Sequence, residues 1–212
     1  MDEAKFAKWG LLAGAVFVVL SVVAAFIAGT PPKLSDADGT IVKYFQDNQD
    51  ALKIGSYLNG LGGLFFLWFL GSLFGRLRRA EGGAGRLSGV ALTGAVVALA
   101  TVYVAGGISA FSAIHPTTAP GDFRLSTLLF GYAAFPLAVF TAAVSVVLWS
   151  QNVLPKWMGY AGEGIAVLWL VGAASVSTEN DTIGVIGLIA FLAWGVWILL
   201  LSVLLYRTPE AA

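Results

Sequence analysis

The sequence predicts an all-α membrane protein in which six transmembrane helices form one bundle, and three observations indicate this fold. The chain of 212 residues contains six apolar runs, and a helix of about 20 residues spans the roughly 30 Å of a hydrocarbon core. Only one acidic residue, Glu163, lies well inside any run. Charged residues make up 11% of the chain and hydrophobic residues 58%, whereas about a quarter of a soluble domain is charged.

The six runs define the helices of a single domain that covers residues 1–212. Their approximate bounds are 9–28, 54–74, 87–113, 126–150, 157–176 and 183–206. The first run follows Lys5 and Lys8 and ends in small residues, as a secretory signal does. It exceeds the usual signal core of about 7 to 15 residues, so we expect it to remain as the first transmembrane helix.

The segment between the first two runs is the longest stretch expected in water. Pro31 and Pro32 end the first helix, because proline restricts the residue before it and has no amide hydrogen. Ile41, Phe45 and Leu52 then recur at helical spacing, which predicts a short extracytoplasmic amphipathic helix. This helix is either a lid over a ligand pocket or a simple return to the second run, and the simple return is favoured.

Lysine and arginine near the ends of the runs predict the orientation, because the side richer in these residues faces the cytoplasm. One side collects Lys5, Lys8, Arg76, Arg78, Arg79, Arg86, Lys156 and Arg207, and the other has Lys33, Lys43, Lys53 and Arg124. Both chain ends are therefore expected in the cytoplasm.

Four arginines surround the glycine-rich connection between the second and third runs, namely Arg76, Arg78, Arg79 and Arg86. They are candidate contacts for anionic lipid, because a basic residue beside a charged leaflet gains about 1 kcal/mol. The simpler interpretation is that they only set the topology. We favour it, because the connection lacks the GxxxxGK[ST] spacing of a nucleotide-binding loop.

Glu163 is the first candidate for a ligand or proton site, since it lies about 9 Å into the fifth run. A carboxylate at this depth can carry a proton or neutralise a cationic ligand. In the favoured structural interpretation it reaches back to the headgroups, or pairs with basic residues on its side or with the hydroxyl of Tyr160. Asn59, the other strongly polar candidate, lies near the outer end of the second run and is not expected to share this site.

His115, Asp122 and Arg124 form a candidate site in the second outer loop. A polar loop with one histidine is more often a solvated connection, and we favour that interpretation. A single histidine excludes two-histidine haem ligation within one chain, and the absence of cysteine excludes disulfides, thiolate metal sites and iron–sulfur clusters. We expect no cofactor, no metal and no enzymatic activity.

Two segments carry a recognisable pattern. Residues 57–73 read YLNGLGGLFFLWFLGSL and are followed by RLRRAEG at 76–82 and GRL at 85–87, while residues 154–159 read LPKWMG. They resemble a recurring pattern, with an LPxWxG turn, in a family of uncharacterised bacterial integral membrane proteins of about this length. The resemblance covers most of the chain. It implies a six-helix architecture in the bacterial cytoplasmic membrane, but no mechanism and no functional residue.

We expect a protein that binds a lipid or small apolar ligand, or serves as an accessory subunit of a larger membrane complex, because polar groups within the runs are too few for a hydrophilic pathway. Its expected partners are membrane lipids, other membrane subunits or a second copy of the chain. The net charge of zero does not suggest nucleic acid binding. The alternative is a small proton-coupled transporter or channel, in which Glu163 titrates and a kink at Pro136 moves.

Overall fold

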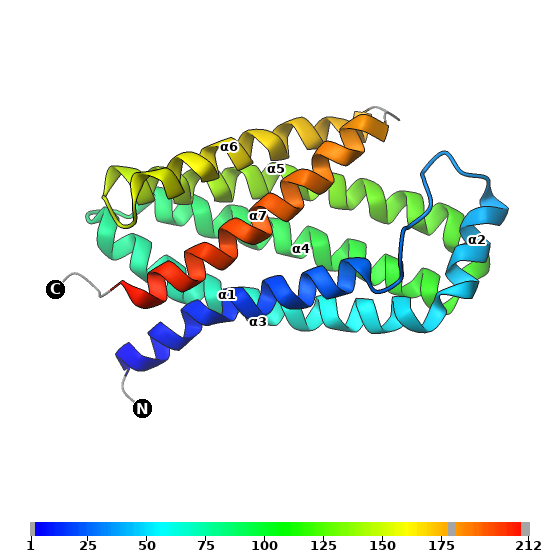
Figure 1. The fold of residues 1–212 in the computed structure, drawn as a ribbon, viewed down its shortest axis with the longest axis horizontal. Coiled ribbons are helices and arrows are strands. Elements are labelled where there is room, and N and C mark those ends of the chain that lie inside the picture. Colours follow the sequence, from blue (N-terminus) through cyan, green and yellow to red (C-terminus); the bar gives the residue numbers. More distant parts are fainter. Residues whose placement is uncertain (1–2, 178–180, 209–212) are drawn as a thin grey trace.

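The computed structural model describes residues 3–177 and 181–208, and every regular element within these ranges is helical. In this part of the chain six long helices run side by side, and one short helix lies across an end of the bundle (Figure 1). The long helices are α1 (Glu3–Phe26), α3 (Gln49–Glu81), α4 (Arg86–Ile114), α5 (Ala119–Ser150), α6 (Lys156–Ala173) and α7 (Asp181–Arg207). The short ones are α2 (Asp38–Asp47) and the 3₁₀-helical turns η1 (Pro116–Thr118) and η2 (Ala174–Ser177). The all-α prediction is confirmed.

Five of the described helices are long and apolar enough to cross a membrane. These segments are Lys8–Phe26, Gln49–Glu81, Arg86–Ile114, Pro116–Ser150 and Val185–Arg207. The helix that does not qualify is α6, which has 18 residues and includes the charged side chains of Lys156 and Glu163. Apolar spans are therefore shown for five of the six predicted helices.

Several helix ends differ from the predicted bounds. The helix predicted over 54–74 is α3, which extends from Gln49 to Glu81. Largely polar turns lengthen it past the apolar run at both ends. Its 33 residues rise about 50 Å, more than the hydrocarbon core requires. The short amphipathic helix α2 ends at Asp47, so Leu52 belongs to α3. The fifth helix, α6, ends at Ala173 and the chain continues as η2.

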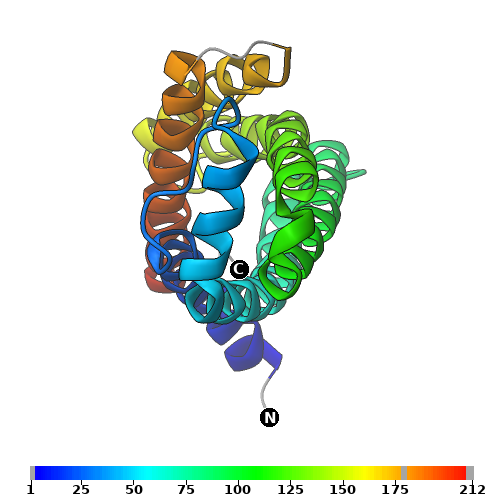
Figure 2. The same cartoon turned by 90° about the vertical axis from the view of Figure 1, so that its right-hand side faces the viewer.

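The six long helices form a ring. Each packs against its neighbours in sequence, and α1 packs against α7, which closes the ring around a central axis (Figure 2). Aromatic side chains fill the centre: the ring centroid of Phe66 lies 4.6 Å from that of Phe17 and 5.8 Å from that of Trp194. Phe140 adds a fourth helix to this cluster, 6.0 Å from Phe66. Such close packing holds helices together in lipid, where no hydrophobic force acts between them.

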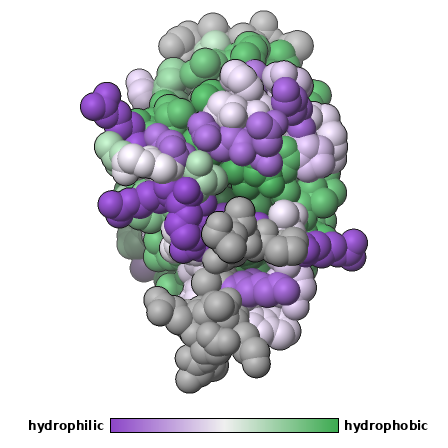
Figure 3. Space-filling view, turned by 90° about the vertical axis from the view of Figure 1, so that its left-hand side faces the viewer, coloured by the Kyte–Doolittle hydropathy of each residue, from purple (hydrophilic) through white to green (hydrophobic). Residues whose placement is uncertain are grey.

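The bundle has two different ends. At one end α2 buries Ile41 and Phe45 against Ala119 at the start of α5. The hydroxyl of Tyr44 in α2 donates to the carbonyl of Ala28 at 3.3 Å, and burial raises the pKa of this hydroxyl above its ordinary value. The α3–α4 and α5–α6 connections, the start of α1 and the end of α7 lie at the opposite end (Figure 1). Hydrophilic residues gather over much of that second end (Figure 3).

Candidate functional site

The structure separates the four candidate arginines. Arg76 is 9% exposed, and its Nη2 donates to the carbonyl of Thr208 at 2.7 Å, after the end of α7. Arg79 also has an interaction partner, whereas Arg78 is exposed and its aliphatic stem lies against Gly85. Arg86 is exposed at the start of α4 and makes no side-chain hydrogen bond or ion pair with residues 3–177 and 181–208.

A carboxylate of the chain already occupies the N-terminus of α4. The oxygens of Glu81 accept hydrogen bonds from the backbone amides of Leu87 and Ser88, both at 2.9 Å, and from the Ser88 hydroxyl at 2.8 Å. These amides belong to the first helical turn and have no partner within the helix. Sequence reasoning missed Glu81, because it reaches α4 across a loop whose Gly82, Gly83 and Gly85 have positive φ angles that favour glycine.

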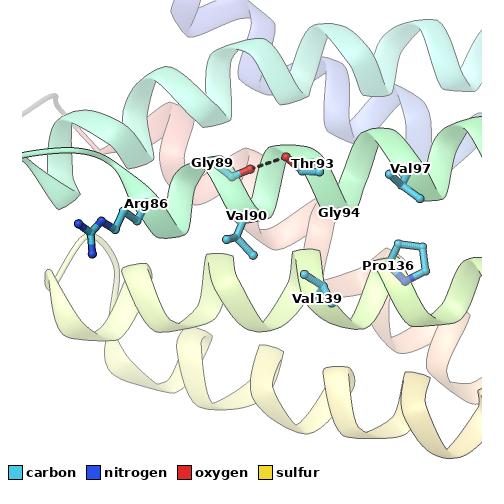
Figure 4. A pocket seen from close by; sticks show the side chains of 8 residues that line it. All are labelled: Arg86, Gly89, Val90, Thr93, Gly94, Val97, Pro136 and Val139. Atoms are coloured by element: carbon cyan, nitrogen blue, oxygen red, sulfur yellow. Dashed lines mark hydrogen bonds between the residues drawn. The ribbon is translucent and has the colours of Figure 1, made fainter.

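A groove of about 590 Å³ lies between α4 and α5 on the outside of the ring (Figure 4). Its lining residues are Arg86, Gly89, Val90, Thr93, Gly94, Val97, Pro136 and Val139. The Thr93 hydroxyl donates to the carbonyl of Gly89 at 3.0 Å, so it is satisfied within its own helix. Arg86 is therefore the one charged side chain on a wall that is otherwise apolar.

Close contact of the helices forms the floor of the groove. A Cβ atom at Gly94 would lie 2.9 Å from the carbonyl oxygen of Pro136 and 3.0 Å from the amide nitrogen of Phe140, so α4 and α5 meet backbone to backbone. A Cβ at Gly89 would meet nothing within 4 Å, so the groove stays open beside it. The missing side chains at these two glycines leave the space that Val90 and Val139 border.

The groove has the length of one membrane leaflet. Arg86 and Val97 bound it on α4. They lie eleven positions apart on the helix, a rise of about 16 Å, close to half of the roughly 30 Å hydrocarbon core. The groove thus extends from a cation at the polar end of the bundle toward its middle.

Glu163 is bound to an indole. Its Oε1 accepts a hydrogen bond from Nε1 of Trp149 at 2.7 Å, and Trp149 lies one residue before the end of α5. The Trp149 ring stacks on Tyr160, with centroids 6.2 Å apart and planes 29° apart. A Cβ at Gly159 would lie 2.8 Å from Cδ1 of Trp149, so this glycine leaves room for the indole. Sequence reasoning placed Glu163 and Tyr160 together but missed Trp149, which lies on a different helix, α5.

Asn59 does not join this pair. It lies in the first half of α3, the half that follows α2, and its Nδ2 would be 3.4 Å from a Cβ at Gly106 of α4. Beside it the Tyr103 hydroxyl of α4 donates to the carbonyl of Gly60 at 3.1 Å. Asn59 thus belongs to the α3–α4 contact.

The placement of all three outer-loop candidates in a loop was wrong: His115 lies between α4 and η1, whereas Asp122 and Arg124 belong to the first turns of α5. The three side chains also have separate partners. Arg124 donates to the carbonyls of Leu34 at 3.2 Å and Asp36 at 3.3 Å, and to Oδ1 of Asp38 at 2.9 Å. The carboxylate of Asp122 accepts from the hydroxyl of Thr118 at 2.7 Å. The ring of His115 stacks on Phe111, with centroids 4.5 Å apart. Arg124 thus ties the α1–α2 loop to α5. Within residues 3–177 and 181–208 no three His, Asp or Glu side chains gather as metal ligands.

Comparison with family models, with curated proteins and with solved structures gives no match. The resemblance to the bacterial membrane family stays a prediction. The groove and the Glu163 pair are therefore interpreted from their own geometry.

Proposed function

We propose that this chain is a lipid-binding integral membrane protein of the bacterial cytoplasmic membrane, and that the groove between α4 and α5 holds an apolar chain. The groove itself carries this proposal. The side chains of Val90, Val97 and Val139 on its wall face the surroundings of the bundle. They are 46%, 50% and 47% exposed. An acyl chain against these side chains gains dispersion contacts that the wide groove leaves unmade.

The proposal includes six membrane crossings with both ends of the chain in the cytoplasm. In support, α6 runs along the other long helices, and the start of α1 and the end of α7 lie at the same end of the bundle (Figure 1). The 18 residues of α6 rise about 27 Å, and η2 extends the segment by another turn. The positive-inside rule then assigns the arginine-rich end to the cytoplasm.

An accessory role in a larger membrane complex is compatible with the same groove, because a lipid often fills the seam between subunits. Membrane lipids, a second copy or other subunits are the proposed partners. Native mass spectrometry from a mild detergent measures bound lipid, copy number and companions together.

Proton-coupled transport or conduction through Glu163 is the alternative. The observation in its favour is a partly buried carboxylate in α6, with the indole of Trp149 as its one hydrogen-bond partner among the described residues. Against it, large aromatic side chains fill the centre of the ring, where a hydrophilic pathway would need polar groups.

The variant Gly89→Leu tests the proposed groove. Because a Cβ at Gly89 meets nothing within 4 Å, a side chain at this position starts in open space and extends into the groove. We expect the population of lipid-bound protein in native mass spectra to fall about fivefold or more, since the leucine takes the place of part of the acyl chain and a loss of about 1 kcal/mol in binding free energy lowers the affinity by about that factor.

The matched control is Gly107→Leu. This glycine lies on the same helix, outside the groove, and a Cβ there also meets nothing within 4 Å. It should leave lipid occupancy at the parent value. Equal occupancy in both variants and in the parent would reject the groove as the binding site.

A further inference from the structure

We propose that the α4–α5 groove selects an anionic phospholipid, with the lipid phosphate on the guanidinium of Arg86 and one acyl chain along α4 toward Val97. This inference rests on the proposed lipid-binding function and adds the chemical class of the lipid. Three features of the groove carry it: its single charge, the occupied helix terminus beside it and its length.

The charge at the groove end is unpaired. The side chain of Arg86 has no hydrogen-bond or ion-pair partner in the described part of the chain, and its guanidinium extends beyond the end of the groove (Figure 4). A guanidinium presents a planar fork of donors that matches two phosphate oxygens. An uncharged apolar ligand would leave this group unused.

The side chain of Arg86 must supply this recognition, because the helix terminus is unavailable. Amides at the start of a helix are a common phosphate site, but those of Leu87 and Ser88 donate to Glu81. Moreover, a cation in the first turn of α4 opposes the helix dipole, so Arg86 does not strengthen its own helix. Its substitution by an uncharged residue should therefore leave α4 intact.

The length of the groove matches a membrane lipid better than a soluble anion. From Arg86 the apolar wall continues for about 16 Å, the depth of one leaflet. Phosphate at the level of Arg86 therefore places an acyl chain against Val90 and Val97. A soluble anion would need no such wall.

A matched control lies in the same connection. Arg78 is exposed like Arg86, has the same charge and lies outside the groove. Arg76 and Arg79 are unsuitable, because each has a partner in the structure. A general attraction of this protein end for anionic lipid would depend on Arg78 and Arg86 alike, whereas the proposed site depends on Arg86 alone.

The experiment compares the parent protein with Arg86→Gln, Arg78→Gln and Gly89→Leu. Each is purified in mild detergent, checked by thermal melting and titrated with phosphatidylglycerol or phosphatidylcholine of identical acyl chains, and bound lipid is counted by native mass spectrometry. We expect the parent to prefer phosphatidylglycerol. Arg86→Gln should lower that preference about fivefold, the equivalent of one basic residue at a charged surface, and leave phosphatidylcholine binding unchanged. Arg86→Lys should retain part of the preference, because it keeps the charge but loses the fork.

The outcomes separate the two proposals. If Arg86→Gln keeps the parent preference, or if Arg78→Gln lowers it equally, the headgroup inference is wrong, while a loss of both lipids in Gly89→Leu still supports the groove. If Gly89→Leu binds both lipids as the parent does, the proposed function itself is wrong. A selective loss in Arg86→Gln together with a general loss in Gly89→Leu supports both.

Discussion

Glu163 illustrates how single polar residues are accommodated in this apolar chain. Its Cα lies in the second turn of α6, but its carboxylate bonds to Trp149, which is almost the last residue of α5. The side chain therefore reaches back toward the polar end of the bundle, as long polar side chains do near membrane surfaces. Arg76 is a second example, because its hydrogen-bond partner Thr208 lies 132 residues further along the chain.

The hydrogen bond between Glu163 and Trp149 predicts different effects of two substitutions. Glu163→Gln keeps an oxygen acceptor for the indole, so the free energy of unfolding should change by less than about 0.5 kcal/mol. Glu163→Leu leaves the indole N–H without its acceptor and should cost about 1–2 kcal/mol. Thermal denaturation in detergent, followed by near-ultraviolet circular dichroism, measures both.

Glu163→Gln also tests the transport alternative. With a pH-sensitive dye inside proteoliposomes, we expect no proton uptake above that of empty liposomes in either the parent or the variant. Uptake by the parent that disappears in a stably folded Glu163→Gln protein would support proton coupling and contradict our preferred function.

At the scale of elements, the α4–α5 pair determines the groove. Gly94 lets the backbones of α4 and α5 touch. About one and a half turns earlier on α4, at Gly89, the space between the two helices is open. Pro136 contributes its carbonyl to this contact, and α5 continues through it as one helix. The kink considered for Pro136 stays a prediction.

The backbone contact at Gly94 predicts that Gly94→Ala destabilises the protein by about 1–3 kcal/mol, because the added methyl group meets atoms that cannot rotate away. The control Gly107→Ala adds the same methyl group into open space on the same helix. It should be neutral or stabilising by up to about 1 kcal/mol through helix propensity. Thermal denaturation in detergent compares the two, and equal stability would contradict the close contact of α4 and α5.

At the scale of the whole molecule, the chain closes a ring by packing each long helix against the next one and α7 against α1. This order needs only short connections between the long helices except at α2. There, Arg124 of α5 binds the α1–α2 loop through two backbone carbonyls and Asp38. The ring therefore has one end covered by α2 and one end rich in arginine.

The native absence of cysteine allows a direct test of the crossings. Single cysteines are introduced at four exposed positions, Ser35, Ala84, Gln151 and Ala174. If α6 crosses the membrane and both chain ends are cytoplasmic, a membrane-impermeant maleimide should label positions 35 and 174 in intact cells. Positions 84 and 151 should react only after permeabilisation.

The labelling pattern distinguishes six crossings from five. Labelling of positions 151 and 174 from the same side would show that α6 does not cross. Labelling of positions 84 and 151, but not 35, in intact cells would reverse the orientation.

The sequence predicted the helical class and five apolar spans well, because helix length and apolar composition are local properties that the bilayer thickness constrains directly. It predicted the ends less well. From the apolar run alone, the end of α3 is predicted at residue 74. The polar turns around Arg78 continue the helix beyond that point. Neighbouring backbone geometry, rather than hydropathy, decides where such turns end.

The candidate polar residues were visible in the sequence, since each is rare in its surroundings, but their partners were not. Only the tertiary structure brings Trp149 to Glu163, ties Arg124 to Asp38 and separates Arg86 from the other arginines. The groove likewise arises where Gly89 and Gly94 of one helix face Pro136 of another. The physical reason is that hydropathy acts along the chain, whereas close packing and hydrogen bonding in an apolar bundle depend on which helix faces meet.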